Sequence, residues 1–229
     1  MIADNIKNIQ ENIVDAAKRA NRDGSAAALI AVSKTKPVSM LMEAYRAGMR
    51  DFGENKVQEL MDKIPLMPGD VRWHMIGHLQ TNKVKYIVGK VHLIHSVDSL
   101  RLAEEISKVS VSRGVLSNIL IEVNVSGEES KYGIPYEQAL ELVYQISKLP
   151  AVQIEGLMTI APFSTNPEDS RVVFRKLKQL SVDILQKNID NVCMNVLSMG
   201  MSGDYQIAVE EGATYVRVGS DIFGNRVYQ

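Results

Sequence analysis

The sequence predicts a single parallel (β/α)8 barrel of the TIM type, preceded by one extra N-terminal helix. Two observations carry this prediction: eight strand-like runs alternate with helical patterns, and no shift in composition or low-complexity tract divides the 229 residues. The competing architecture is a doubly wound open sheet, but no Gly-x-Gly-x-x-Gly turn follows the first strand. We therefore expect one domain over residues 1–229.

Short apolar runs are typical of parallel strands that are buried on both faces. The run 118–125 is the clearest, and the run 29–33 is a shorter one that ends immediately before Lys34. The runs interpreted as strands cover residues 29–33, 50–53, 71–78, 91–97, 118–125, 152–159, 196–199 and 214–218.

Helices are predicted from apolar spacing and from residues that begin or end helices. Isoleucines at helical spacing near the N-terminus predict an amphipathic helix before the first strand. The boundary residues are Gly48 and Pro65, which end helices, Asp98, which caps one, Pro135, which opens one, and Asn166-Pro167, which caps and opens another. The predicted helices cover 2–20, 38–47, 54 to before Pro65, 100–109, 135–149, 167–186 and 204–211.

The composition is that of an ordinary globular protein, with 45% hydrophobic and 23% charged residues. A net charge of −1 provides no electrostatic surface for nucleic acid or an anionic membrane. The single cysteine, Cys193, cannot form an internal disulfide, which fits a reducing compartment. No signal peptide or membrane-spanning run is visible, so we expect a cytoplasmic protein.

Lys34 stands at the C-terminal end of the first strand, and the active face of such a barrel lies at the C-terminal ends of its strands. Taken alone, this lysine is equally compatible with a side chain that extends into solvent. Three later strands also end in small, polar or basic residues, so we expect their ends to converge with Lys34 on one site.

The loops after the last two strands have the composition of a phosphate site. Gly200, Ser202 and Gly203 follow the seventh strand, and Gly219 and Ser220 follow the eighth. Small residues let backbone N–H groups approach an anion, and hydroxyl groups add donors. Each pair alone would more often be a plain turn, but two pairs on the last two strands of a barrel favour a phosphate cradle.

A lysine across the barrel mouth from a phosphate site suggests Schiff-base chemistry, in which a neutral amine attacks an aldehyde. Lys36 could supply part of the positive field that lowers the pKa of such an amine. The aldehyde could belong to pyridoxal phosphate or to a phosphorylated sugar, as in class I aldolases. Arg217 points into the barrel if its neighbours point outward, and would there bind a phosphate or donate to a ring nitrogen.

The sequence resembles one known family over nearly its whole length. The matching segments are 31–36 (AVSKTK), 52–55 with 57–59 (FGEN, VQE), 74–83 (HMIGHLQTNK), 124–126 with 129–133 (NVS, ESKYG), 156–159 (GLMT), 197–204 (LSMGMSGD), and 216–220 with 222–224 (VRVGS, IFG). As an ordered set they resemble the pyridoxal phosphate homeostasis protein family, small proteins related to the N-terminal barrel of alanine racemase. The resemblance implies the alanine racemase N-terminal-domain fold.

The resemblance also implies roles for individual residues. Lys34 would hold pyridoxal 5′-phosphate as an internal aldimine, and Arg217 would face the pyridine nitrogen. Ser202, Gly219 and Ser220 would bind the phosphate. The residues that would line the pocket are Asn55, Met199, Met158 and Thr159.

Two lysines stand apart from these assignments. Lys131, in the loop after the fifth strand, matches a lysine that the family is thought to use in handling the cofactor, although a loop lysine is by default solvated. Lys56 stands where family members often have an aromatic residue, and we assign it no function.

The same resemblance points away from catalysis. An arginine cannot keep the pyridine nitrogen protonated as a carboxylate would, so the cofactor is a weaker electron sink. In alanine racemase a second proton-transfer group comes from a C-terminal domain of the partner chain. This chain ends at Gln229, about eleven residues after Val218, so we expect no such domain.

We therefore expect a non-catalytic, monomeric protein that buffers pyridoxal phosphate and delivers it, possible recipients being apo-enzymes that need this cofactor. The alternative is a small active pyridoxal phosphate enzyme such as an amino-acid racemase, with Tyr132 or a histidine as the missing acid. A third possibility is an aldolase that forms its Schiff base without any cofactor.

A metal site is not expected. His74 and His78 share a strand face, but residues four apart on a strand are separated by roughly 13 Å. His92 and His95 are three apart and face opposite ways on their strand. Cys193 has no neighbouring base in the sequence, so we expect it to pack structurally.

Overall fold

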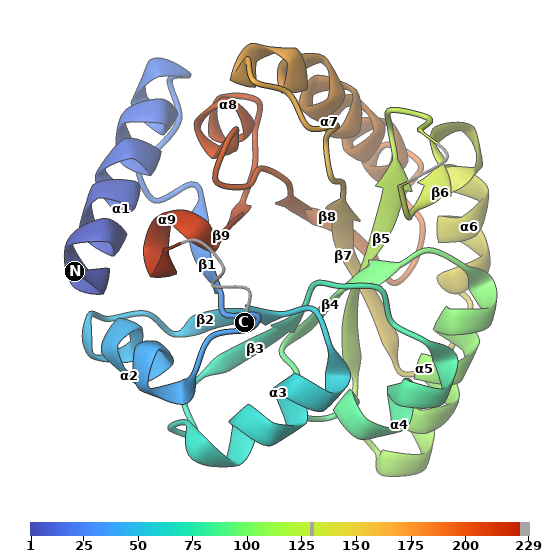
Figure 1. The fold of residues 1–229 in the computed structure, drawn as a ribbon. Helices are drawn as coiled ribbons and strands as arrows, with labels where there is room; N and C mark the ends of the chain where they lie inside the picture. Colours follow the sequence, from blue (N-terminus) through green and yellow to red (C-terminus); the bar gives the residue numbers. More distant parts are fainter. Residues whose placement is uncertain (129–130, 225–229) are drawn as a thin grey trace.

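The computed structural model describes residues 1–128 and 131–224 and shows a closed parallel barrel ringed by helices (Figure 1). Neighbouring strands pair in parallel from β1 to β5 and then through β7, β8 and β9 back to β1. Within the described residues, the eight barrel strands are β1 Ala28–Val32, β2 Asp51–Glu54, β3 Arg72–Met75, β4 Leu93–Val97, β5 Ser117–Asn124, β7 Val152–Met158, β8 Val192–Ser198 and β9 Tyr215–Val218. The predicted barrel is confirmed.

The helices follow the strands around the outside of the barrel. They are α1 Ile2–Arg19, α2 Val38–Arg46, α3 Val57–Lys63, α4 Val84–Ile87, α5 Leu100–Arg113, α6 Ala139–Ile146, α7 Arg171–Leu185, α8 Tyr205–Glu210 and α9 Ser220–Phe223. Single 3₁₀ turns cover Ile64–Leu66, Thr81–Lys83, Tyr136–Gln138 and Pro167–Ser170. No helix in the described part of the chain combines the length and the hydropathy that crossing a membrane requires.

Several predicted boundaries differ from the structure, among them the start of the seventh barrel strand, β8, which begins at Val192 and not at residue 196. Asp98 does not cap α5, because Ser99 occupies the N-cap position and neither residue's side chain caps the helix. Pro135 does precede a helical segment as predicted, since it is the N-cap of the 3₁₀ turn Tyr136–Gln138 that leads into α6, but it also belongs to a short extra strand, β6 Ile134–Pro135, which pairs with the end of β5. The helix predicted to start at Glu54 begins at Val57, because Glu54 is still part of β2.

The sequence analysis also missed α4, between β3 and β4. With only four residues, this helix has no apolar period long enough to identify it. The Asn166 cap is confirmed, since its side-chain oxygen accepts a hydrogen bond from the Glu168 amide at 3.3 Å.

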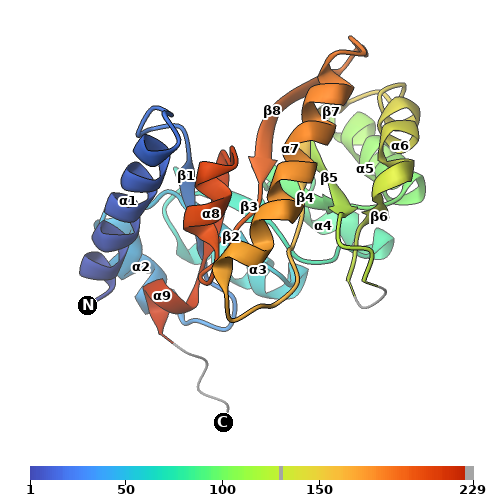
Figure 2. The same cartoon turned by 90° about the horizontal axis from the view of Figure 1, so that it is seen from above.

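Helix α1 is the extra N-terminal helix that the sequence predicts, and it packs against α2, α8 and α9 (Figures 1 and 2). Its isoleucines form the buried face. The Asn5 side chain donates to the Ile222 carbonyl at 3.0 Å, which ties α1 to the last helix of the barrel. The N-terminal helix therefore supports the segment that carries Ser220.

The barrel interior has an apolar layer and a polar layer. Side chains of a strand alternate between its two faces, so residues two apart point the same way. The apolar layer includes Leu93, Leu120, Val196 and Tyr215, which belong to one small cluster. Two positions further along the same strands, the polar layer holds His95, Glu122, Ser198 and Arg217, all of them buried. The polar groups therefore lie toward the C-terminal ends of the strands.

Glu122 is the member of the polar layer with an unpaired buried atom. Its Oε2 atom has no hydrogen-bond partner among the described residues. Burial, and next the charge of Asp98, raise the pKa of Glu122 from 4.5 to about 7, although Arg217 opposes the shift. The native state therefore holds this proton at pH values where the unfolded chain has lost it.

We expect Glu122→Gln to stabilise the cofactor-free protein at pH 8 and to change little at pH 4.5. Between these values the native state binds more protons than the unfolded state, so the wild type loses stability as the pH rises. The amide abolishes this loss, which is at most about 3 kcal/mol since one pKa unit corresponds to about 1.4 kcal/mol.

Urea unfolding of the wild type and of Glu122→Gln at both pH values measures the difference between their free energies of unfolding. Glu155→Gln, on neighbouring β7, is the control because Glu155 lies outside the buried polar layer. An equal effect of Glu122→Gln at the two pH values would contradict the assignment.

Candidate functional site

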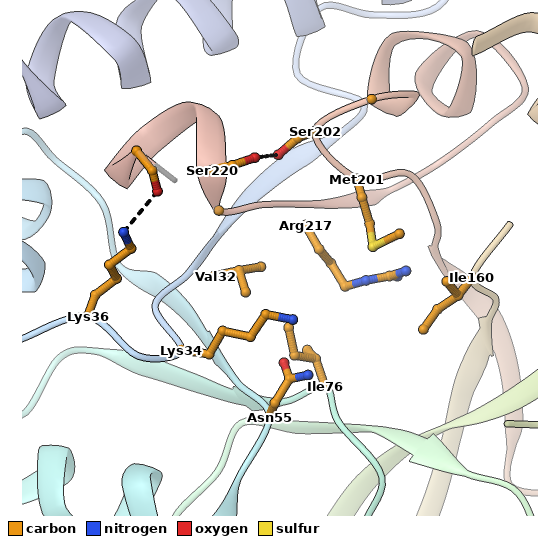
Figure 3. A pocket seen from close by; sticks show the side chains of 13 residues that line it. Val32, Lys34, Lys36, Asn55, Ile76, Ile160, Met201, Ser202, Arg217 and Ser220 are labelled. Carbon is orange, nitrogen blue, oxygen red and sulfur yellow. Dashed lines mark hydrogen bonds between the residues drawn. The ribbon is translucent and has the colours of Figure 1, made fainter. Parts of the chain in front are cut away.

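A cavity of about 580 Å³ opens where the C-terminal ends of the strands meet. Its polar lining includes six of the seven residues proposed from the sequence: Lys34, Asn55, Ser202, Arg217, Gly219 and Ser220. Val32, Ile76, Ile160 and Met201 form apolar walls. Lys34 and Arg217 both extend into this space (Figure 3). Such a volume suits a small molecule.

The backbone on both sides of Lys34 is held by the side chains of Lys63 and Glu59. Lys63 donates to the Ser33 carbonyl at 2.8 Å, and the Ser33 hydroxyl donates to Glu54 Oε1 at 2.6 Å. On the other side, the Thr35 amide donates to Glu59 Oε1 at 2.6 Å. Thr35 has a φ of 63°, a left-handed conformation that is unfavourable for a β-branched residue.

Lys63 joins these contacts into one cluster. Its ammonium group lies 2.7 Å from Glu54 Oε1 and 2.6 Å from Glu59 Oε1, and the residue is only 5% exposed. A buried cation is tolerated when it is paired and hydrogen-bonded, as here. The cluster therefore fixes the turn from which Lys34 extends.

Arg217 is buried in the cavity wall and is held by two acceptors. Its Nη1 donates to the Ser198 hydroxyl at 2.6 Å and its Nη2 donates to the Thr159 carbonyl at 2.9 Å. Burial lowers the pKa of Arg217 to about 10, which leaves it a cation at neutral pH. The guanidinium group therefore brings a fixed positive charge to the cavity.

Ser202 and Ser220 meet although they are 18 positions apart in the chain. The Ser220 hydroxyl donates to that of Ser202 at 2.9 Å (Figure 3). Gly219 immediately precedes the first turn of α9, where backbone N–H groups have no partners within the helix. Two hydroxyl groups and a helix start thus face one corner of the cavity.

Two glycines, Gly200 and Gly77, immediately adjoin residues that line the cavity. Gly200 has a φ of 90°, and a Cβ atom there would lie 2.5 Å from the Ala208 Cβ, so the turn before α8 requires glycine. Gly77 packs against the backbone of Asn55, because a Cβ atom would lie 2.5 Å from the Asn55 carbonyl oxygen. This close approach fixes Asn55, whose buried Oδ1 has no hydrogen-bond partner among the described residues.

Lys36 also lines the cavity, but its ammonium group is engaged by the end of α9. It donates to the Phe223 carbonyl at 3.2 Å and to the Gly224 carbonyl at 2.8 Å. Of the two lysines at the cavity, Lys36 therefore secures the last described segment of the chain.

Several residues proposed from the sequence lie elsewhere. Met199 is fully buried in the hydrophobic core, and Met201 lines the cavity in its place. Met158 belongs to the apolar layer inside the barrel. Thr159 contributes only the carbonyl that holds Arg217, and Lys131 lies on the loop after β5, outside the cavity lining. The site roles of Met199, Met158 and Lys131 receive no support from the lining.

The sequence analysis missed the polar groups behind Arg217. His95 Nδ1 lies 2.8 Å from the Ser198 hydroxyl, and His95 Nε2 lies 2.9 Å from His74 Nδ1. His74 Nε2 in turn lies 3.0 Å from Asp51 Oδ1. Strand alternation could have placed both histidines inside the barrel, but not in contact with each other. No cluster of potential metal ligands forms in the described parts of the chain.

The cavity is suited to a small phosphorylated aldehyde. Lys34 offers an amine, Arg217 a fixed positive charge, and Ser202 and Ser220 offer hydroxyl donors. The unpaired oxygen of Asn55 is one further polar group that a ligand could engage. Pyridoxal 5′-phosphate has the aldehyde, the phosphate and the ring nitrogen that match this set of groups.

Comparisons with known proteins agree with this geometry. Residues 5–227 match the family model "Alanine racemase, N-terminal domain". The pyridoxal phosphate homeostasis protein of Aquifex aeolicus is 47% identical over 224 residues, which cover 97% of each chain.

Solved structures of other proteins share the fold of this chain. PipY of Synechococcus elongatus, solved with pyridoxal phosphate bound, is 35% identical, with a TM-score of 0.82 over 98% of this chain and 100% of PipY. Alanine racemase of Clostridium difficile is only 13% identical and shares the fold, with a TM-score of 0.76 over 99% of this chain and 58% of the racemase. By its sequence and its fold, this chain belongs to the alanine racemase N-terminal-domain family and, within it, to the pyridoxal phosphate homeostasis proteins.

Proposed function

We propose that this protein binds pyridoxal 5′-phosphate in the barrel cavity, buffers it and delivers it to other proteins, with no robust turnover of its own. The observation that carries the proposal is the convergence of Lys34, Arg217 and the Ser202–Ser220 pair on one cavity. Two relatives support it: the Aquifex protein carries the pyridoxal phosphate homeostasis name, and PipY has been solved with the cofactor bound.

The polar residues of the cavity have separate roles in binding the cofactor. When bound, pyridoxal phosphate supplies an aldehyde that condenses reversibly with an amine. Lys34 is the amine for this attachment, and Arg217 holds a donor toward the ring nitrogen. The hydroxyl groups of Ser202 and Ser220, with the backbone at Gly219, bind the phosphate. Asn55 lines the wall beside Lys34.

The lining favours binding over catalysis. Among the described residues that form it, none carries a carboxyl, imidazole or phenol group for proton transfer. Tyr132, the acid considered for a racemase, is 61% exposed and stacks on His78 with ring centroids 4.5 Å apart. Arg217 is already hydrogen-bonded within the barrel and is a poor acid at neutral pH. The second lysine of the described lining, Lys36, donates to the Phe223 and Gly224 carbonyls, so we assign the attachment to Lys34 and no proton transfer to Lys36.

The proposal has three further parts. Residues 1–229 act as one domain and as a monomer. The recipients of the cofactor are apo-enzymes that require it. The protein is located in the cytoplasm. Its single cysteine, Cys193, cannot form an internal disulfide, and proteins without disulfides are typical of reducing compartments.

We expect the cofactor-loaded protein to absorb visible light, and borohydride reduction to leave one adduct on Lys34. Lys34→Ala should lose both signals because it removes the attacking amine. Lys36→Ala is the matched control from the same cavity and should keep them. Absorbance spectra and peptide mass mapping give the answer, and a colourless protein trapped only by a sugar phosphate would instead identify an aldolase.

We expect Ser202→Ala and Ser220→Ala each to weaken binding of pyridoxal 5′-phosphate by about fivefold, the effect of one lost hydrogen bond. Binding of pyridoxal, which lacks the phosphate, should not change. Titrations followed by absorbance compare the two ligands. If both ligands lose affinity equally, the serines do not form the phosphate site.

We expect no racemisation or other turnover of free amino acids above the rate of free pyridoxal phosphate, since the described lining residues include no carboxyl, imidazole or phenol group and Lys36 is engaged by the Phe223 and Gly224 carbonyls. Chiral chromatography of L-alanine and a panel of other L-amino acids tests this. A rate that Lys34→Ala abolishes would make the protein an enzyme and sink the non-catalytic proposal.

A further inference from the structure

A row of hydrogen bonds runs through the barrel interior behind the cavity. It starts at Arg217 Nη1, which lies 2.6 Å from the Ser198 hydroxyl, and continues through His95 and His74 to Asp51. The serine and both histidines have no exposed surface, while Arg217 is 4% and Asp51 6% exposed. The five residues come from five strands, and their contacts depend on barrel closure.

The two ends of the row determine the direction of every hydrogen bond. Arg217 can only donate, so the Ser198 oxygen accepts and its own hydrogen must point to His95 Nδ1. At the other end, burial alone would raise the pKa of Asp51, but donation by His74 and Arg72 outweighs it and lowers the pKa to about 2. The ionised carboxylate can only accept, so His74 Nε2 carries a hydrogen.

The direction of the hydrogen bond between the two histidines follows from the hydrogen bonds at Ser198 and at Asp51. His74 donates from Nε2 and is neutral, so its Nδ1 is an acceptor. His95 accepts at Nδ1 and is neutral, so its Nε2 carries the hydrogen that bridges the two rings at 2.9 Å. Burial lowers the pKa of both imidazoles, in agreement with neutral rings.

We propose that Asp51, His74, His95 and Ser198 are positioning residues for Arg217. In this positioning chain every hydrogen points from Arg217 toward Asp51, and both imidazoles are neutral Nε2–H tautomers. The chain keeps the Ser198 oxygen available as an acceptor and so fixes the guanidinium group at the cavity. The predicted effect on the cofactor rests on the proposed function, whereas the hydrogen-bond direction does not.

Other proton arrangements leave a buried group without a partner. If His95 carried a hydrogen on Nδ1, the Ser198 oxygen would accept from both Arg217 and His95, and the buried Ser198 hydroxyl hydrogen would lose the acceptor that His95 offers. A buried donor without an acceptor costs about 1–3 kcal/mol. The arrangement in which every hydrogen points from Arg217 toward Asp51 is therefore favoured because it pairs the Ser198 hydrogen with His95 Nδ1.

The end of the positioning chain at Asp51 is held by the side chain of Arg72. Arg72 donates from Nε to Asp51 Oδ1 at 2.7 Å and from Nη2 to Oδ2 at 2.5 Å, and its side chain is half exposed. Both residues line a second cavity of about 270 Å³, at the opposite end of the barrel from Lys34. The rings of His92 and Tyr215 pack edge-on against His74. The chain thus spans the barrel from one cavity to the other.

Nitrogen NMR of the cofactor-free protein tests the direction of the chain. We expect Nδ1 of His74 and of His95 to be unprotonated and both Nε2 atoms to carry a hydrogen. Asp51→Asn removes the terminal charge with little change of shape, so the Nε2–H signals of His74 and His95 and the guanidinium signal of Arg217 should all shift. Asp70→Asn is the matched control, an exposed carboxylate at the same end and outside the chain.

Two different NMR results would each overturn the proposal. An Nδ1–H tautomer or a charged ring at either histidine in the wild type would overturn the proposal without any variant. A shift confined to His74 in Asp51→Asn would also overturn it, because a chain must transmit the change to Arg217.

Cofactor binding gives a second readout. Ser198→Ala should weaken binding of pyridoxal 5′-phosphate by about fivefold, the effect of one lost hydrogen bond. Asp51→Asn should weaken it less, and Asp70→Asn should leave it unchanged. If the wild type binds no cofactor, the proposed function fails while the NMR result still decides the chain. If it binds and Ser198→Ala has no effect, the chain does not position Arg217.

Discussion

Closure of the parallel sheet is the constraint on which the rest of the molecule depends. The pairing of β4 with β5 and of β9 with β1 leaves no open edge, so each barrel strand has a neighbour on both sides. Because all the strands run the same way, their C-terminal ends meet at one mouth (Figure 1). Residues far apart in the chain, such as Lys34 and Ser220, become neighbours there.

Closure also creates an interior from which water is excluded, and two cations near the site need compensation for this. Lys63, the last residue of α3, packs against β2 and is paired with Glu54 and Glu59. Arg217 lies inside the wall and is connected to the Asp51 carboxylate through Ser198 and the two histidines. The first arrangement holds the backbone around Lys34, and the second holds the side chain of Arg217.

Much of the fold could be predicted from local patterns. Each strand from β1 to β5 was placed within three residues of its true bounds, because buried parallel strands are apolar runs. The errors occurred where tertiary contacts decide: Glu54 remains in β2, and β8 begins at Val192, before the run 196–199 that was expected to form it. Helix α4 is too short to show a period.

By itself, the sequence determined the barrel, the family and the residues at the strand ends, since apolar alternation, glycine positions and motif order are local properties of the chain. Only the tertiary structure decided that Met201 lines the cavity while Met199 is buried, and that His74 meets His95. Strand alternation gives the face on which a side chain lies. The register between strands that are distant in sequence, which sets which side chains touch, is determined only when the barrel closes.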